Sequence, residues 1–391
     1  MKKYIFIRRN DFSTMLDVAT WVKTVKHINQ IEDCKAEVVF TCSDKQIKAP
    51  SNVTLLMLPK LRYVYYFSYL IALFFFLKKR LKNKDKNIIF FDIFSFPIIP
   101  LLKIFGYFDS NTTAVIDYRT FYFNYSDNEA SSFKDKFFKW LTIMSFKYAK
   151  KNNIRLSIIV EKMKDFIKEY IDIESMEIII WSSGVEPGDF NVDQNVLKKY
   201  KDKFSWLNEV PTFIFHGHLT ENRGIEKIID SFTYLKDKID FHFLIIGDGP
   251  AKKSILSTIE KNKMQNCCHF IGKVDYSEIK YYISIADIAI MTYPIIKYWE
   301  YNNPIKFSEY MLLNKFIITS KISSFVKMVS NGRGLIIDNV DINSIRETIE
   351  YSCNNIKKIR IEESKKESRD YILNNYTWKK QAEIIVNNSI K

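Results

Sequence analysis

Short apolar runs alternate with longer stretches of helical periodicity along the whole chain. In the first half, these runs lie at Lys3–Ile7, Glu37–Thr41, Val53–Leu58, Asn87–Phe91, Thr113–Asp117 and Leu156–Val160. In the second half, they lie at Thr212–His216, Phe241–Ile246, His269–Gly272, Ile288–Met291, Phe316–Thr319 and Leu335–Asp338. Buried strands separated by helices are typical of parallel sheets with crossover helices. Because the pattern occurs twice, we expect an α/β protein with two Rossmann-like domains.

The two halves are separated by a segment rich in turn-forming residues. After the apolar run Met176–Trp181 comes SSGVEPGDFN, which holds two glycines and a proline. Glycine and proline this close together are typical of a linker. We expect a first domain over 1–190 and a second over 191–376. A helical pattern over 377–391 has no strand of its own to cover, so we expect it to pack back on the first domain.

Composition narrows the class of protein. Only 10 of the 391 residues are glycine, and nine of these follow residue 183, whereas 47% of the residues are hydrophobic. A chain of this kind can bury large cores and is not disordered. The five cysteines form no CxxC pair, which argues against a zinc or disulfide framework. The start MKKYIFIRRN is typical of a strand rather than a signal peptide. We therefore expect a cytoplasmic protein.

The net charge of +14 leaves several partners open. Nucleic acid, an anionic membrane surface and phosphorylated small molecules all attract basic proteins. The excess can equally reflect a sequence that uses lysine as its general surface residue. The aromatic residues crowd into apolar runs instead of alternating with basic residues, which argues against a nucleic-acid-binding module.

Tyr63–Leu77 is an uninterrupted run of 15 apolar or aromatic residues with basic residues at both ends. A membrane-spanning helix needs about 20 residues, so we expect no span here. Two alternatives remain open at this point. The segment is either a buried crossover helix or a surface helix that dips into a bilayer with its basic ends on lipid headgroups.

Most of the glycines in the second half follow predicted strands. Gly217 follows the first of these strands, and Arg223 opens the next helix. A later strand ends in Gly247-Asp248-Gly249, and another ends at Gly272. Loops without side chains at the carboxyl ends of parallel strands let a ligand approach the backbone.

A fourth element is the segment Asn302-Asn303-Pro304-Ile305-Lys306, followed by Glu309. Asn303 suits a helix N-cap and Pro304 suits the first helical turn. Lys306 and Glu309 lie three residues apart and therefore share a helix face. A cation near a helix start suits a diphosphate, and a carboxylate one turn later suits sugar hydroxyls. The alternative is an ordinary surface ion pair.

Taken together, these segments resemble glycosyltransferase family 4. The matching motifs are G-x-L-x-x-x-[KR]-G, I-I-G-x-G-P, F-x-G-x-V, A-D-I-x-[IV]-x-x-x-P and N-x-P-x-K-x-x-E-Y-M over about 211–340. Asp117-Tyr118-Arg119 resembles a D-x-R segment of the same family. The resemblance implies a retaining, nucleotide-sugar-dependent glycosyltransferase of the GT-B fold, whose two Rossmann-like domains face a central cleft. The second domain would bind the donor and the first domain the acceptor.

The resemblance also implies roles for particular residues. Arg223, Lys306 and Glu309 would form the catalytic group, with the cations at the donor diphosphate and Glu309 at the ribose. The further donor-binding positions are Gly217, His218, Gly247, Gly249, Gly272, Lys273, Val274, Asn302 and Asn303. Three departures stand out: His218 replaces a common arginine, Tyr301 replaces the first glutamate of the E-x7-E motif, and no glycine-rich loop follows the first strand.

Asp117, Arg119 and Glu300 are candidates for contacts with the acceptor or the transferred sugar. In the mechanism that the resemblance implies, the oxygen of the leaving diphosphate takes the acceptor's proton. The protein then supplies positioning and positive potential. No D-x-D motif follows a strand, so we expect a metal-independent enzyme without a cofactor.

We expect a sugar to be moved from a nucleotide sugar to an acceptor that is a polyprenyl-diphosphate-linked saccharide. This would take place at the inner face of the cytoplasmic membrane, in the synthesis of a bacterial capsule, O-antigen, exopolysaccharide or lipopolysaccharide. The expected partners are the donor, the acceptor and the membrane surface through the basic and aromatic first domain, but no nucleic acid. Two other classes stay open, a nucleotide-sugar epimerase of the same architecture and a non-enzymatic basic protein that binds membranes or nucleic acid.

Overall fold

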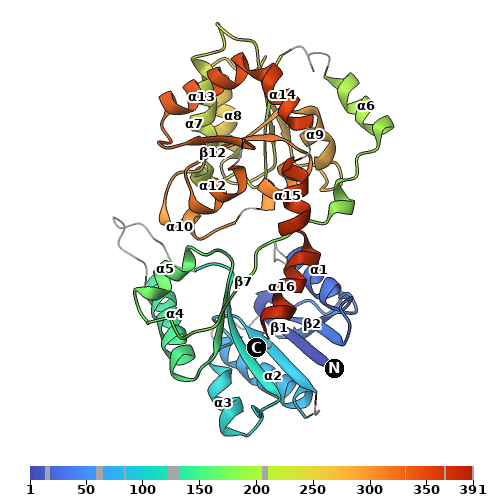
Figure 1. The fold of residues 1–391 in the computed structure, drawn as a ribbon, viewed down its shortest axis with the longest axis vertical. Helices are drawn as coiled ribbons and strands as arrows, with labels where there is room; N and C mark the ends of the chain where they lie inside the picture. Colours follow the sequence, from blue (N-terminus) through green and yellow to red (C-terminus); the bar gives the residue numbers. More distant parts are fainter. Residues whose placement is uncertain are drawn as a thin grey trace. The chain divides into compact units, whose positions relative to one another are not determined.

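The computed structural model describes residues 1–13, 18–58, 65–82, 85–121, 133–204, 210–303, 305–330, 332–364 and 367–389. The chain divides into two compact units (Figure 1). The first unit consists of Met1–Gly184 together with Trp378–Lys391, and the second unit consists of Val185–Thr377.

Seven parallel strands form the sheet of the first unit in the described part of the chain. They are β1 (Lys2–Asp11), β2 (Cys34–Cys42), β3 (Val53–Met57), β4 (Lys86–Phe91), β5 (Thr112–Tyr118), β6 (Arg155–Ile158) and β7 (Ile178–Ile180). Their order across the sheet is β3-β2-β1-β4-β5-β6-β7. The chain therefore runs outward from β1 to β3 and then crosses back to β4. The carboxyl ends of β1 and β4 form a topological switch point, where open α/β sheets bind ligands.

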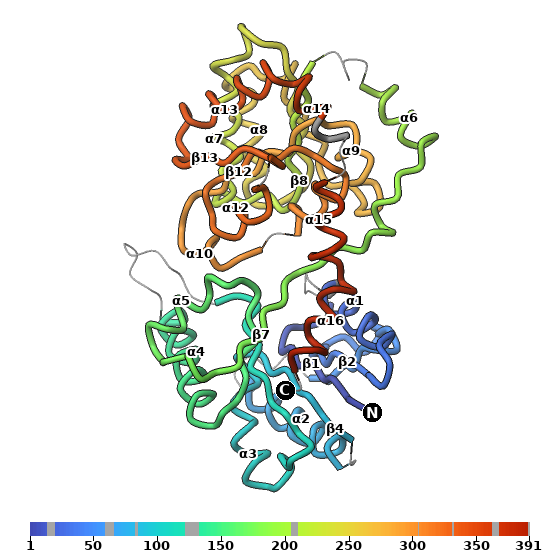
Figure 2. Tube along the Cα trace, viewed as in Figure 1, coloured from blue at the N-terminus to red at the C-terminus, as the bar shows by residue number. Residues whose placement is uncertain are grey.

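The helices of the first unit cover both faces of this sheet. They are α1 (Val18–Ile28), α2 (Tyr65–Arg80), α3 (Ile98–Ile104), α4 (Phe133–Lys151), α5 (Met163–Lys168) and α16 (Trp378–Asn388). Because parallel crossovers are right-handed, the reversal after β3 places α1 on one face and α2 to α5 on the other. The C-terminal helix α16 packs against α1 and β7 (Figure 2).

The apolar stripes of α1 and α16 explain why these helices lie together. Trp21, Val25 and Ile28 of α1 are fully buried, at the spacing of one helix face. On α16, the buried stripe includes Ala382 and Ile385. Both stripes join the same core cluster with the inner side chains of the sheet.

Six parallel strands form the sheet of the second unit as far as the structure describes it. They are β8 (Thr212–His216), β9 (His242–Ile246), β10 (Cys268–Gly272), β11 (Ile288–Met291), β12 (Phe316–Ser320) and β13 (Gly334–Ile337). Their order is β10-β9-β8-β11-β12-β13, so a second switch point lies between β8 and β11. The central strands are buried along their length, as expected of a parallel sheet covered on both faces.

Helical segments precede, cover and follow the sheet of the second unit. They are η1 (Pro187–Phe190), α6 (Gln194–Lys203), η2 (Glu221–Arg223), α7 (Ile225–Thr233), α8 (Lys252–Lys261), α9 (Ile279–Ile285), α10 (Lys297–Glu300), α11 (Ile305–Leu312), α12 (Ser323–Val329), α13 (Ile342–Asn354), α14 (Ile356–Ser364) and α15 (Glu367–Asn375). The expected α/β fold class with two Rossmann-like parallel sheets is thereby confirmed. The central cleft between them stays a prediction.

The apolar run Tyr63–Leu77 falls largely on α2. Its first two residues lie outside the described residues, and the helix continues to Arg80. Within the described part of the chain, no helix combines the length and the apolar character that crossing a bilayer requires.

Candidate active site

Three glycines interlock at the carboxyl edge of the second sheet, where β8 and β9 end. Gly217, Gly247 and Gly249 have φ values of 138°, 140° and 155°, which side chains other than glycine rarely adopt. A Cβ on Gly247 would collide with the Gly217 carbonyl oxygen, and one on Gly249 would collide with Leu219. Backbone hydrogen bonds join the two loops, including 2.9 Å from Gly217 N to Ile246 O. The two loops are therefore joined through their backbones and carry no side chains at these three half-buried positions.

Lys306, in the first turn of α11, crosses over these loops. Its side chain covers Gly217 so closely that a Cβ there would collide with the lysine Cε. The pKa of Lys306 is lowered to about 8, mainly because the side chain is buried and also because of the positive charge of Arg223, while Glu309 opposes the shift. The ammonium group makes no salt bridge with any described residue. An anion that occupied the edge would meet a cation whose charge is not already neutralised.

Glu309, one turn further along α11, is 2% exposed. Its Oε1 accepts a hydrogen bond of 2.8 Å from the hydroxyl of Tyr276, which comes from the segment between β10 and α9. Its Oε2 lies 3.2 Å from Nε2 of His216, the last residue of β8. A carboxylate that a tyrosine hydroxyl holds on one oxygen can accept hydrogen bonds from the hydroxyl groups of a sugar.

His216 completes the floor of the site. Burial lowers the pKa of its ring well below the usual value, and the charges of Lys306 and Arg223 add to this effect. The ring is therefore neutral at physiological pH. Its backbone N–H donates a hydrogen bond of 2.9 Å to the hydroxyl of Tyr310. The rings of the two residues pack edge to face, with their centres 4.8 Å apart. These contacts fix the end of β8 against α11.

Arg223, at the end of η2, is positioned by two aromatic residues. Its Nη1 donates 2.9 Å to the hydroxyl of Tyr293, and its guanidinium carbon lies 5.4 Å from the Tyr293 ring and 5.8 Å from the Trp299 ring. The Trp299 indole in turn donates 3.0 Å to the Asn222 carbonyl. The Arg223 Nε–H is buried and finds no hydrogen-bond partner among the described residues. Arg223 is thus held in place while its Nε–H remains able to donate a hydrogen bond to a ligand.

The remaining predicted donor residues lie around this group. Gly272 ends β10, and its carbonyl accepts a hydrogen bond of 2.8 Å from Gly247 N. After it, Lys273 is exposed and Val274 is half-buried. The exposed His218 lies with Nδ1 at 3.0 Å from the Asp248 carbonyl. The donor-binding roles of these residues stay predictions.

Some of the predicted residues before α11 contact α12 instead of the glycine loops. The Asn302 carbonyl accepts 2.8 Å from the Ser324 hydroxyl, whereas Asn303 is half-buried. Pro304 lies outside the described residues. Glu300, a candidate contact for the transferred sugar, accepts 3.1 Å from the Ser323 N–H at the start of α12. Its carboxylate therefore caps that helix.

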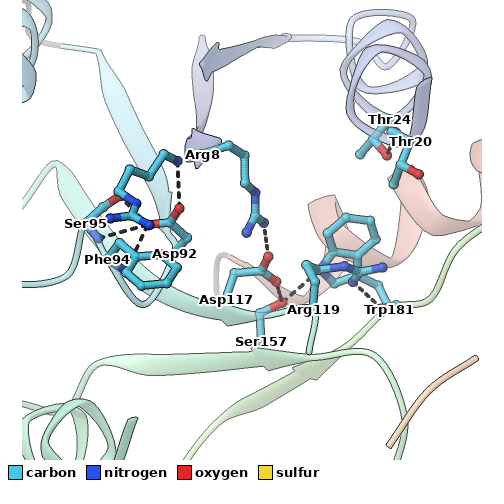
Figure 3. Close-up of polar contacts among 11 residues, drawn as sticks. Arg8, Thr20, Thr24, Asp92, Phe94, Ser95, Asp117, Arg119, Ser157 and Trp181 are labelled. Atoms are coloured by element: carbon cyan, nitrogen blue, oxygen red, sulfur yellow. Dashed lines mark hydrogen bonds and ion pairs between the residues drawn. The ribbon is translucent and has the colours of Figure 1, made fainter. Parts of the chain in front are cut away.

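Asp117 and Arg119, the other two candidates, lie at the carboxyl edge of the first sheet. Asp117 is 2% exposed and binds Arg8 on one oxygen and Ser157 at 2.5 Å on the other. Ser157 also accepts 2.8 Å from the Trp181 indole. Figure 3 shows this group, with Arg119 beside Trp181. The Arg119 guanidinium lies 3.8 Å over the Trp181 ring and donates 2.8 Å to its carbonyl.

Sequence reasoning missed four residues that shape the second-unit site, namely His216, Tyr276, Tyr293 and Trp299. The position of His216 directly before Gly217 was the available signal, since a polar residue at a strand end faces the ligand edge. Tyr276 lies between β10 and α9, whereas Tyr293 and Trp299 both lie between β11 and α11. The aromatic character of these three residues alone indicates only a core.

Two other features bear on the location of the site. No group of three or more metal-ligating side chains occurs in the described residues. Two surface hollows of 430 and 660 Å³ lie at the opposite edge of the first sheet, near the starts of its strands. The first contains Lys150 and Arg155, both already paired with carboxylates.

The second-unit site therefore offers two unneutralised cations, glycine backbone and a buried carboxylate at one switch point. The cations and N–H groups suit a diphosphate, and the carboxylate suits a polyol such as ribose. This combination is the chemistry of nucleotide binding.

Solved structures share the whole architecture. One is WaaG, described as a glycosyltransferase involved in lipopolysaccharide biosynthesis, with a TM-score of 0.70, 12% identity and coverage of 99% of this chain and 100% of that one. Another is Alr3699/HepE of Anabaena in complex with UDP and glucose, with a TM-score of 0.69, 11% identity and 98% of both chains covered. At these identities the likeness establishes the fold alone, which is GT-B.

Sequence comparisons match mainly the second unit. Residues 198–368 match the model of glycosyl transferases group 1. An uncharacterized glycosyltransferase of Methanocaldococcus jannaschii is 25% identical over 268 residues, which cover 65% of this chain and 61% of that relative. The second unit therefore carries a group 1 glycosyl transferase domain. This confirms the expected resemblance and enzyme class at the level of that domain, and the family number stays a prediction.

Proposed function

We propose that the protein is a retaining glycosyltransferase that binds a nucleotide sugar at the carboxyl edge of the second sheet. The observation that carries this proposal is the group formed by Lys306 over Gly217, with Arg223 and the buried Glu309 beside it. A group 1 domain contains this constellation. The UDP and glucose in the Anabaena structure named above are consistent with such a donor.

In the proposed reaction, the bond between the sugar C1 and the diphosphate oxygen breaks while an acceptor oxygen bonds to C1 from the same face. The acceptor's proton passes to the departing diphosphate oxygen, so the atoms and charges balance. Arg223 and Lys306 stabilise the negative charge that develops on the leaving group. Glu309 orients the ribose hydroxyls. The two cations supply the positive charge, and we propose that no metal ion or cofactor is required.

We propose that the acceptor is a lipid-linked saccharide reached at a membrane surface. On α2, Phe67, Ile71 and Phe75 recur every fourth residue and are 68%, 58% and 61% exposed. The last turn of the same helix carries Lys78, Lys79 and Arg80. An exposed apolar stripe with adjacent basic residues suits the interface of an anionic bilayer.

A second exposed stripe lies on α4, which covers the same face of the first sheet as α2. Its members are Phe133, Phe137, Trp140 and Met144, with exposed fractions from 41% to 87%. Exposed apolar surface of this kind can mark a site of membrane or protein interaction. We propose peripheral attachment to the inner face of the cytoplasmic membrane, for synthesis of a surface polysaccharide such as capsule, O-antigen, exopolysaccharide or lipopolysaccharide.

The test begins with a panel of UDP- and GDP-sugars. One of them is expected to raise the melting temperature of the protein and to lose its sugar when a polyprenyl-diphosphate-linked saccharide is added. NMR of the product is expected to give the same anomeric configuration as the donor, in EDTA as well as in magnesium. A panel without any stabilising nucleotide sugar would contradict the proposal. Epimerisation of the donor in the absence of an acceptor would identify an epimerase instead.

A further inference from the structure

The switch point of the first sheet holds two consecutive arginines at the end of β1. The pairing register between β1 and β2 breaks between Arg8 and Asp11, so Arg9 leaves the regular ladder. The Arg9 N–H donates 2.8 Å to Oδ2 of Asp92, and its carbonyl accepts 2.8 Å from the Thr41 hydroxyl. The backbone at Arg9 is therefore fixed from both neighbouring strands.

The two arginines differ in how their charge is used. Arg8 is 5% exposed, pairs with Asp117 and lies 3.6 Å over the Trp21 ring. Its charge is neutralised inside the unit, as Figure 3 shows. Arg9 is half-buried and pairs with no carboxylate of the described residues. Its guanidinium is therefore a cation at this edge that a ligand could meet.

Asp92 accepts a hydrogen bond from the Arg9 backbone but forms no ion pair with its guanidinium. Asp92 directly follows β4, and its carboxylate accepts hydrogen bonds from neutral donors. Oδ1 accepts from the N–H groups of Phe94 and Ser95 at 3.1 and 2.8 Å and from the Ser95 hydroxyl, and Oδ2 accepts from the Arg9 backbone. These bonds hold the loop of Asp92, Phe94 and Ser95 together (Figure 3). The Arg9 guanidinium carbon lies 3.9 Å from the centre of the Phe94 ring. A guanidinium stacked on a ring keeps its edge N–H groups for a bidentate anion.

An aromatic path connects Arg9 with the exposed stripe of α2. The Tyr66 ring lies 5.9 Å from the Arg9 guanidinium, and its hydroxyl donates 2.9 Å to the Phe94 carbonyl. The Phe67 ring, 6.4 Å from that of Tyr66, begins the stripe that continues through Ile71 and Phe75. A cation therefore adjoins an apolar surface that is open to solvent.

We propose that Arg9 binds the diphosphate of the lipid-linked acceptor and that the lipid chain follows the stripe on α2. The inference rests on the proposed function and assigns an acceptor subsite to the first unit. An anionic group joined to a long apolar chain matches both parts of this surface. A free phosphate would match the cation alone, so the two sources are separable by experiment.

The test measures binding of farnesyl diphosphate, inorganic pyrophosphate and UDP to the full chain by calorimetry. Arg9→Gln is expected to lower the affinity for farnesyl diphosphate and for pyrophosphate about tenfold, because one charge-assisted contact is lost. The affinity for UDP is expected to stay unchanged. Arg9→Lys is expected to restore part of the affinity, because lysine keeps the charge without the flat stack. The control is Lys86→Gln, an exposed lysine at the opposite end of β4, which should change none of the three.

The proposed position of the lipid chain is tested with Phe67→Ser, which is expected to lower the affinity for farnesyl diphosphate but not the affinity for pyrophosphate. Equal effects on both ligands, or pyrophosphate binding as tightly as farnesyl diphosphate, would mean that the edge receives a free phosphate and would overturn the lipid assignment. Unchanged affinities in Arg9→Gln, or an equal loss for UDP, would overturn the acceptor subsite itself. UDP binding to the unchanged protein reports separately on the proposed donor site.

Discussion

Glu309 is oriented by contacts from two other elements in the absence of a ligand. Tyr276 binds one of its oxygens, and His216 lies at the other. The buried histidine is neutral, so the negative charge of the carboxylate is retained for a ligand rather than cancelled by a buried imidazolium. A fixed carboxylate loses little orientational freedom when it accepts sugar hydroxyls, which favours binding.

Replacing this carboxylate tests its assigned role. Glu309→Gln keeps the side-chain shape but removes the charge, and charge-assisted hydrogen bonds contribute about 1.5–3 kcal/mol. We expect kcat/KM for the nucleotide sugar to fall about 10- to 100-fold, with little change in melting temperature. Glu260→Gln, on the exposed face of α8, is the matched control. Turnover near that of the unchanged protein would remove Glu309 from the site.

The lowered pKa of Lys306 predicts a pH-dependent affinity for UDP. Below pH 8 the lysine is charged and can bind the diphosphate, whereas above pH 8 the free protein loses this charge. UDP should therefore bind more weakly as the pH rises from 7 to 9.5, and binding near pH 8 to 9 should take up a proton. Calorimetry in two buffers with different ionisation enthalpies measures both effects.

Two variants assign this pH dependence. Lys306→Met is expected to bind UDP weakly and with no change over the same pH range. Lys253→Met, which alters an exposed lysine of α8, should retain the behaviour of the unchanged protein. The same slope in Lys306→Met would show that another group titrates.

Single residues differ in how far the sequence predicted them. Arg223, Lys306 and Glu309 stood out because each follows a glycine or a helix start at a set spacing. The structure brings them to one switch point, although their roles stay predictions. Tyr276 and Trp299 could not be found in this way, because their contacts depend on how separate loops fold back onto the sheet. Glu300 was a candidate because of sequence spacing alone, and it caps α12.

At the scale of elements, the glycine loops set how closely α11 can approach the sheet. Gly247→Ala would place a methyl group against the Gly217 carbonyl at a φ of 140°. We expect this change to lower the free energy of unfolding by more than about 1 kcal/mol, since alanine strains such a backbone. We also expect weaker UDP binding, because the loop under Lys306 must shift. Denaturant titration and calorimetry measure the two effects.

Gly188→Ala is the control for this prediction. Gly188 lies in η1, has no atom within 4 Å of an added Cβ and does not have a positive φ. The substitution should leave UDP binding unchanged. If Gly247→Ala were as stable and as active as Gly188→Ala, the close approach of the loops would not require glycine at this point.

Elements were more predictable than contacts. The apolar runs predicted the strands because buried parallel strands lack polar alternation, as in Phe213–Phe215 of β8 and Phe243–Ile246 of β9. The register break after Arg8 could not be predicted, because the backbone of Arg9 there bonds to Asp92 and Thr41, which are distant in sequence. The buried pair of Arg8 and Asp117 was likewise hidden, and Asp117 had suggested a ligand contact instead.

At the scale of the whole molecule, the net charge of +14 and the exposed aromatic stripes on α2 and α4 both bear on what the first unit contacts. Burial of an apolar side chain in the membrane interface and attraction of lysines to anionic lipid add to each other. Each lysine or arginine near such a surface contributes about 1 kcal/mol, which salt screens. The stripe on α2 combines both contributions within one helix.

We therefore expect the protein to sediment with vesicles that contain anionic lipid and to do so less at high salt. A variant with Phe67, Ile71 and Phe75 all replaced by serine should lose most of this binding and most of its transfer to a lipid-linked acceptor. Its affinity for UDP should be unchanged, because the donor site lies in the other unit. Replacing Tyr234, Tyr351 and Ile361, which are exposed on the second unit, controls for a general loss of apolar surface. Equal vesicle binding by the two triple variants would contradict a membrane-facing role for α2, because the attachment would then depend on net charge alone.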